Sequence, residues 1–400
     1  MYHGPFGWMD AFAALVAGAR ASEYCSASVA NRGTIVAFSI PECTMTSARE
    51  RSADFCARFG LRLPILLAPM AGACPVSLAV AVANAGGAGA CGALLMGPAE
   101  IAQWAEEFRA QSSGPFQINL WMPDPTPVRD AAHEERVRSF LTAFGPAVPA
   151  DAGDARPPDF AAQCEALLAA SPDVISSIMG LYPPAFVKRV RERGITWFAT
   201  ATTVEEAVAA EAAGADVIVA QGMEAGGHRG CFDAAQAERR LVGLFALLPA
   251  VVDAVSTPVV AAGGIADARG VAAALTLGAS AVQIGTGFLR SPEARLNPAW
   301  ADALGSARPE QTMLTRAFSG RAGRSIATRY VIAAAEPAAP APAPYPVQRG
   351  LTAAMRTQAQ AVSDVDRMQA WAGQSAALAR AMPAGELTRA LWESARVLLP

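Results

Sequence analysis

Short apolar runs alternate with amphipathic stretches from residue 64 to residue 284. Most of these runs are rich in Val, Ile, Leu or Ala and end in a polar or glycine-containing turn, which is typical of strands buried on both faces. The pattern predicts eight strands, at residues 64–70, 87–92, 116–120, 173–180, 196–200, 217–219, 258–262 and 281–284.

Helical periodicity fills the intervals between these runs. In the interval 99–111, for example, the residues Ile101, Trp104 and Phe108 lie on one helical stripe. Thr203, followed three residues later by Glu206, predicts a capping box at the start of another helix. The predicted helices cover residues 76–83, 99–111, 184–193, 203–213, 241–255 and 267–277. Strand–helix units in this number favour a closed (β/α)₈ TIM barrel over an open Rossmann sheet.

Two regions interrupt the alternation. Residues 122–158 are rich in proline and hold one predicted helix at 131–144, so we expect a lid insertion after the third strand. Residues 335–346 are too proline-rich for a helix and predict a stiff extended crossing. Helices are expected after it at 351–361, 364–380 and 385–397. We therefore divide the chain into a barrel at 56–330 and a C-terminal part at 331–400 that packs over it.

Residues 1–55 show no sustained periodicity, and we expect a poorly ordered N-terminal extension. Met45 could serve as a start, which would place residues 1–44 outside the natural product; N-terminal sequencing of the native protein tests this. The apolar stretch 11–19 resembles the core of a signal peptide. Because Asp10 precedes it and no Lys or Arg lies upstream, we do not expect export.

Composition narrows the class of protein. Hydrophobic residues make up 52% of the chain and charged residues 17%, which supplies a large core. A net charge of −3 without a basic block argues against nucleic-acid and anionic-membrane partners. Residues 78–97 are nearly uncharged, but their five glycines and Asn84 indicate a helix, a turn and a strand rather than a membrane span.

Cysteine and histidine usage points to the cytoplasm and away from a metal site. The seven cysteines are odd in number and form no CxxC pair, so we expect reduced thiols. The three histidines form no HExxH motif and no carboxylate cluster accompanies them, so no metal is expected.

Two glycine turns end the last two predicted strands. Gly263-Gly264 follows the seventh strand and Gly285-Thr286 follows the eighth. Neighbouring turns at the C-terminal end of a barrel present backbone N–H groups that bind the phosphate of a cofactor. No GxGxxG motif that would indicate a dinucleotide site directly follows the first strand. The chain contains no GxxxxGK[ST] or GxSxG motif that would indicate a P-loop or a serine-hydrolase site.

His228 follows the sixth strand and the glycine pair Gly226-Gly227. A titratable side chain on a glycine-rich turn at the end of a parallel strand is a candidate for catalysis. The alternative is a core or surface histidine beside a flexible turn. Cys231 is a candidate nucleophile, although a small filler residue near the turn explains it more simply.

Five motifs occur in an order and spacing that closely resemble the nitronate monooxygenases, formerly called 2-nitropropane dioxygenases. They are PILLAPMAGA (64–73), FQINL (116–120), AQGMEAGGHRG (220–230), AAGGIADARG (261–270) and QIGTGFL (283–289). The resemblance extends from about residue 60 to the end of the chain, including PYPVQRGLT (344–352) and WAGQSA (371–376). It implies an FMN-dependent (β/α)₈ enzyme.

The resemblance also implies roles for individual residues. It makes His228 the catalytic base. Residues expected to contact the flavin are Ala68, Pro69, Met70, Asn119, Gln221, Gly226 and Gly227. Residues expected around the phosphate are Gly263, Gly264, Gln283, Ile284, Gly285 and Thr286.

The implied activity is the oxidation of alkyl nitronates, such as propionate 3-nitronate, by O₂ to a carbonyl compound and nitrite, a detoxification that needs no NAD(P)H. The expected partners are the nitronate or nitroalkane and O₂, and the sequence leaves homo-oligomerisation open. One alternative is a flavin-dependent enoyl-thioester reductase that uses NAD(P)H and shares the APM strand, the GGH turn and the AAGGI loop. A flavin-binding carrier or sensor without turnover is a second alternative, which the presence of His228 disfavours.

Overall fold

The computed structural model describes residues 46–400. Most of the predicted N-terminal extension, including the apolar stretch 11–19, lies outside the described residues. Within residues 46–400, no helix is long and apolar enough to cross a membrane.

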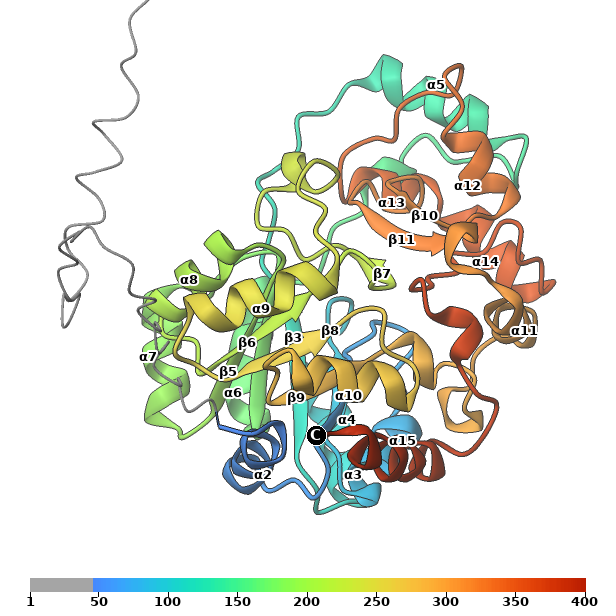
Figure 1. Ribbon diagram of the computed structural model, residues 1–400. Coiled ribbons are helices and arrows are strands. Elements are labelled where there is room, and N and C mark those ends of the chain that lie inside the picture. Colours follow the sequence, from blue (N-terminus) through green and yellow to red (C-terminus); the bar gives the residue numbers. More distant parts are fainter. Residues whose placement is uncertain (1–45) are drawn as a thin grey trace, which may run out of the picture. The chain divides into compact units, whose positions relative to one another are not determined.

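Eight parallel strands form the barrel that the sequence predicts (Figure 1). They are β1 (Ile65–Leu67), β2 (Gly89–Gly92), β3 (Phe116–Trp121), β4 (Val174–Ile178), β5 (Thr196–Ala201), β6 (Val217–Gln221), β8 (Val259–Ala262) and β9 (Ala281–Ile284). Their order in the sheet is β1-β9-β8-β6-β5-β4-β3-β2. A parallel bridge between Leu66 and Ala88 joins the two ends, so the sheet closes. The fold class is confirmed.

Apart from α5 (Ala131–Leu141) in the predicted insertion, seven helices lie between consecutive barrel strands: α3 (Val76–Ala85), α4 (Pro98–Arg109), α6 (Phe160–Ala170), α7 (Pro184–Glu192), α8 (Val204–Ala212), α9 (Leu244–Ala254) and α10 (Ala268–Thr276). The eighth position belongs to α15 (Ala384–Leu398), which packs against both α3 and α10 (Figure 1). Although the sequence predicts residues 385–397 as a helix over the barrel, this helix completes the barrel's outer ring.

Helix α2 (Ala48–Phe59) lies at the N-terminal end of the barrel, below the strands in Figure 1. Its capping box is formed by Ser47 and Glu50, and Gly60 ends it with φ +66°. The rings of Phe55 and Phe59 pack on Phe198 inside the barrel. The boundary of the extension expected at residue 55 therefore falls inside an ordered helix, because the cap and this aromatic stripe specify one.

A second core lies above the C-terminal end of the strands. It combines α5 (Ala131–Leu141), from the predicted insertion, with α12 (Arg329–Ala334), α13 (Val347–Leu351) and α14 (Ala353–Ala361) (Figure 1). A three-stranded antiparallel sheet, which the sequence does not predict, lies beside it: β10 (Thr312–Thr315), β11 (Gly323–Ile326) and the two-residue β7 (Gly227–His228). The remaining helix of this region is α11 (Pro298–Ser306).

The helix predicted at residues 364–380 is wrong. This segment holds only a short 3₁₀ turn, Ala376–Leu378, because its backbone is paired elsewhere. Trp371 bridges to Ser325 on β11, and the Gln374 N–H donates to the Glu224 carbonyl. A Cβ on Gly373 would lie 2.9 Å from that same carbonyl oxygen. Contacts with distant strands therefore override the local helical pattern.

The capping box predicted at Thr203 is half right. The Thr203 side chain accepts from the Glu206 N–H at 3.2 Å and caps α8. The Glu206 carboxylate, however, accepts from the N–H and the hydroxyl of Thr202 and from the N–H of Phe232. It thereby ties the residue before the N-cap of α8 to the loop that follows His228.

Candidate active site

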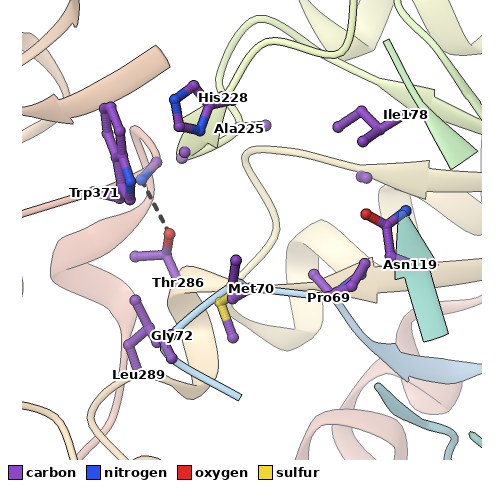
Figure 2. A pocket seen from close by; sticks show the side chains of 18 of the residues that line it. Pro69, Met70, Gly72, Asn119, Ile178, Ala225, His228, Thr286, Leu289 and Trp371 are labelled. Atoms are coloured by element: carbon purple, nitrogen blue, oxygen red, sulfur yellow. Dashed lines mark hydrogen bonds between the residues drawn. The ribbon is translucent and has the colours of Figure 1, made fainter. Parts of the chain in front are cut away.

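A cavity of about 400 Å³ opens at the C-terminal end of the barrel strands. Its volume is in the usual range for small-molecule sites. Strand ends β1, β3, β6, β8 and β9 form its floor, and the segment 349–375 forms part of its wall. Figure 2 shows Pro69, Met70 and Asn119 on one side of this space and His228, Thr286 and Trp371 on the other.

The structure brings nearly all predicted site residues to this cavity. They are Ala68, Pro69, Met70, Asn119, Gln221, Gly226, Gly227, His228, Gly263, Gly264, Gln283, Gly285 and Thr286. Ile284 is not among the lining residues. Side chains alternate along β9, so Gln283 faces the cavity while Ile284 is buried among the hydrophobic residues between barrel and helices.

The two glycine turns present unpaired backbone donors. Within residues 46–400, no hydrogen bond uses the N–H groups of Gly264, Ile265, Gly285 or Thr286. All four residues line the cavity, and helix α10 begins three residues after Ile265. Gly264 has φ +69°, a conformation that side chains rarely adopt. Free amides beside a helix N-terminus form an anion-binding cradle.

Gln221 holds the loop that carries the histidine. Its Nε2 donates to the His228 carbonyl at 3.2 Å, and its Oε1 accepts from the Gly230 N–H at 2.8 Å. The buried guanidinium of Arg229 donates to the Gln221 carbonyl at 2.7 Å. The end of strand β6 and residues 228–230 are thus tied together through both side chains.

His228 lies on β7 and pairs with Gly323 on β11. Its Nε2 lies 2.7 Å from the hydroxyl oxygen of Ser319. The rings of Trp121 and Trp371 approach the imidazole edge-on, with centroids at 4.5 and 4.7 Å. The imidazole therefore has one polar contact, two aromatic neighbours and one face toward the cavity.

Burial lowers the pKa of His228 to about 3, and the positive charges of Arg321 and Arg349 add to this effect. The imidazole is therefore neutral across the physiological range and available as a proton acceptor. Arg321 is itself buried and forms an ion pair of 2.9 Å with Asp124.

The cavity carries positive but no negative side chains. Arg349 and Arg356 line it, and no Asp or Glu does. Arg356 bonds to Thr352, Gln369 and the Arg349 carbonyl. In the part of the chain that the structure describes, the Arg349 guanidinium has no ion pair or hydrogen bond. Arg349 is half-buried, so its positive charge is only partly solvated, and a cavity with this unpaired charge and no acidic side chain favours an anionic guest.

From the sequence we expect the C-terminal helices to shield the site from water, but we assign no individual residue of the wall 349–375 to it. Trp371 contacts His228, and the Gly373 N–H donates to Thr286 Oγ1 at 3.0 Å, which joins this wall to the β9 turn. The only signals were the motifs PYPVQRGLT and WAGQSA. The predicted insertion at 122–158 contributes no lining residue; Trp121, directly before it, does.

Cys231 does not belong to the cavity lining. Its Sγ donates to the Asp233 carbonyl at 3.2 Å, and burial raises the pKa of the thiol. A protonated thiol is a poor nucleophile, so the geometry supports the interpretation as a small filler residue.

Fold and site together define a (β/α)₈ barrel enzyme with a ligand cavity at the C-terminal ends of its strands. The family model described as nitronate monooxygenase matches residues 56–394. A nitronate monooxygenase of Paraburkholderia phytofirmans is 39% identical over 338 residues, which cover 83% of this chain and 92% of the relative. The chain belongs to the nitronate monooxygenase family, a family of oxidoreductases.

Solved structures agree with this assignment. Nitroalkane oxidase from Streptomyces ansochromogenes aligns with a TM-score of 0.77 and 36% identity over 84% of this chain and 96% of its own. The enoyl reductase domain of MlnA from Bacillus amyloliquefaciens aligns with a TM-score of 0.58 and 13% identity over 86% of this chain and 96% of its own. The second likeness concerns the fold alone.

Proposed function

We propose that the protein is an FMN-dependent nitronate monooxygenase that converts alkyl nitronates and O₂ into carbonyl compounds and nitrite. The observation that carries this proposal is a neutral imidazole at the wall of a cavity that holds two arginines and no acidic side chain. Such a site fits a substrate that is an anion or becomes one.

The cavity fits FMN. The free N–H groups of Gly264, Ile265, Gly285 and Thr286 would hold the phosphate, since unpaired donors on two neighbouring turns suit its oxygens. Gly226 lines the cavity and has no room for a side chain, because a Cβ there would lie 2.5 Å from the Gly373 nitrogen. Ala68, Pro69, Met70 and Asn119 supply the surface for the ring. When bound, FMN would accept electrons from the nitronate and pass them to O₂.

His228 would remove the α-proton of a neutral nitroalkane. A neutral imidazole is the required form, and burial together with Arg321 and Arg349 maintains it. Proton transfer creates an imidazolium and a nitronate at the same moment. The new negative charge offsets the repulsion that the arginines exert on the imidazolium.

Arg349 would bind the nitronate anion. Arg349 lines the same cavity as His228, and among residues 46–400 its guanidinium has no ion pair or hydrogen bond. Trp121 and Trp371 would keep water away from the reacting carbon. The positions of His228 and Arg349 thus separate two tasks, proton removal and anion binding.

Oxygen uptake and nitrite formation with propionate 3-nitronate test the proposal. Rapid anaerobic bleaching of the flavin by the nitronate, with a slow reaction toward NADPH, is the expected stopped-flow result. Rapid bleaching by NADPH alone would instead support the enoyl-thioester reductase alternative. Reversible flavin binding without bleaching by either compound would support a carrier or sensor.

We also propose the cytoplasm as the site of action. Five cysteines within the described residues are all free and buried, as expected for a reducing compartment. Cell fractionation with an antibody against the protein tests this.

A further inference from the structure

Gln117 is a buried amide inside the barrel with no part in the chemistry described above. It lies on β3 and is 2% exposed. Its Nε2 donates to the Leu67 carbonyl on β1 at 3.0 Å and to Oε1 of Gln283 on β9 at 2.9 Å. The side chain thus crosses β2, the strand that joins β1 only through the Leu66–Ala88 bridge.

The orientation of both amides follows from one backbone group. A carbonyl oxygen accepts hydrogen bonds only, so Leu67 requires Gln117 to turn its NH₂ group toward it. The second hydrogen of that NH₂ group then points at Gln283, which must present Oε1. If Gln117 were turned around, its oxygen would face the Leu67 oxygen, an unfavourable contact.

Gln283 is therefore left with its own NH₂ group directed elsewhere. The residue lines the cavity and is 8% exposed. Among residues 46–400, its Nε2 makes no hydrogen bond, and this atom is not fully buried. The NH₂ group of Gln283, whose orientation Gln117 fixes, thus lies at the floor of the cavity, next to the Gly285-Thr286 turn.

We propose that Gln117 is a positioning residue that fixes the Gln283 amide with its N–H donors toward the cofactor. The inference rests on the proposed function, because it takes FMN as the occupant of the cavity. FMN carries hydrogen-bond acceptors on its ring system and its ribityl chain, and the floor of the cavity offers Gln283 as a prepared donor. Gln117 acts only through Gln283, since it does not line the cavity.

A double-mutant cycle on FMN binding tests the inference. The dissociation constant of FMN is measured by flavin fluorescence with apo-protein of the wild type, Gln117→Met, Gln283→Met and the double variant. Each single variant should bind FMN about 3- to 10-fold more weakly, the usual effect of one hydrogen bond. The double variant should be no weaker than Gln283→Met alone, because Gln117 then has nothing to position.

The visible spectrum of bound FMN gives a second readout that a purely structural role would not move. Gln117→Met and Gln283→Met should change it in the same way. Thr388→Val is the control, because Thr388 is a fully buried polar residue on α15 that does not line the cavity and whose hydroxyl donates to the Ala384 carbonyl. It should lower the melting temperature without changing FMN affinity or the spectrum.

Additive losses in the cycle, or unchanged FMN affinity in Gln117→Met, would overturn the inference. If Gln117→Met does not fold, Gln117→Asn keeps a buried amide that is too short to reach Gln283, and the same cycle applies. Selective ¹⁵N-glutamine labelling of the wild-type protein needs no variant at Gln117: FMN should shift the Gln283 amide signal, and an unshifted signal contradicts the inference. A wild-type protein that binds no FMN contradicts the proposed function instead.

Discussion

His228 Nε2 lies 2.7 Å from the hydroxyl oxygen of Ser319, which is 1% exposed. The same hydroxyl lies 3.3 Å from both the N–H and the carbonyl of Arg321. A serine hydroxyl has one proton to donate. If the Ser319 hydroxyl donates its proton to the Arg321 carbonyl, its oxygen accepts from Nε2–H of His228, and Nδ1 is then the basic nitrogen. If the hydroxyl instead donates to Nε2, the ring proton lies on Nδ1. Ser319 therefore determines which ring nitrogen accepts a proton.

Replacing Ser319 by Ala should slow the turnover of a neutral nitroalkane by about 2- to 10-fold, because one hydrogen bond that orients the imidazole is lost. Steady-state oxygen uptake with nitroethane measures this. Ser52→Ala is the matched control: its buried hydroxyl donates to the Ala48 carbonyl at the other end of the barrel. Equal losses in both variants would mean that the effect is one of stability.

Replacing His228 by Asn should preserve the fold and FMN content while removing the base. Turnover of nitroalkanes should fall by roughly 10²–10⁴-fold. Pre-formed nitronates have already lost the α-proton, so their oxidation should fall much less. Oxygen uptake with a nitroalkane and with its nitronate, at equal concentration, separates the two effects. Equal losses on both substrates would give His228 a binding role, and no loss on either would leave it without one.

The pH dependence should show no histidine near neutrality. A base is active when unprotonated, and the pKa of His228 is lowered from 6.5 to about 3. Lowering a pKa moves the acidic limb of the rate profile to lower pH, so kcat/KM for a nitroalkane should not decline as the pH falls from 8 to 5. A decline centred near pH 6.5 would show that the imidazole is more solvated than the structure indicates.

Arg349→Met should weaken the binding of nitronate anions and raise the pKa of His228, since one neighbouring positive charge is removed. Loss of a charge-assisted hydrogen bond predicts a KM increase of about 10- to 100-fold. The acidic limb of the nitroalkane profile should move to higher pH. Arg109→Met is the control, because Arg109 donates to the carbonyls of Ala170 and Ser171 away from the cavity. An unchanged KM in Arg349→Met would refute the anion-binding role.

The sequence predicts the barrel well, because each strand is a short apolar run whose burial on both faces leaves a local signature. It fails where distant segments pair. Strand β11 and the segment around Trp371 form only through contacts across the chain, so periodicity assigned residues 364–380 to a helix. The eighth helix, α15, is identifiable as a helix from sequence. Its place in the ring beside α3 and α10 is not, because about 100 residues separate it from β9.

The candidate site likewise combines residues that local sequence identifies with residues that only contacts across the chain bring to the cavity. His228 and the glycine turns at Gly264 and Gly285 follow strands directly, so a barrel alone brings them together. Arg349 lies on α13, in a second core above the barrel, and nothing local marks it as facing the cavity. Gln117 reads as an ordinary strand residue, and only the distances to Leu67 and Gln283 show what it contacts.

Gly264→Val should lower the FMN content of a folded protein. Gly264 lies in the turn expected to hold the phosphate. It has φ +69°, and an added Cβ would lie 3.3 Å from the Cβ of Glu224. A valine there carries both backbone strain and a side chain that would crowd the free amides. We expect FMN occupancy after purification to fall several-fold, measured by the flavin absorbance relative to protein.

Gly60→Val separates these two effects. Gly60 has nearly the same conformation, φ +66°, with no atom within 4 Å of the added Cβ, and it lies at the end of α2 on the opposite side of the barrel. Both variants should lose about 1–2 kcal/mol of stability from the left-handed conformation. Only Gly264→Val should lose the cofactor, because only that turn carries the free N–H groups. A Gly264→Val protein that purifies with full FMN content would show that the phosphate binds elsewhere.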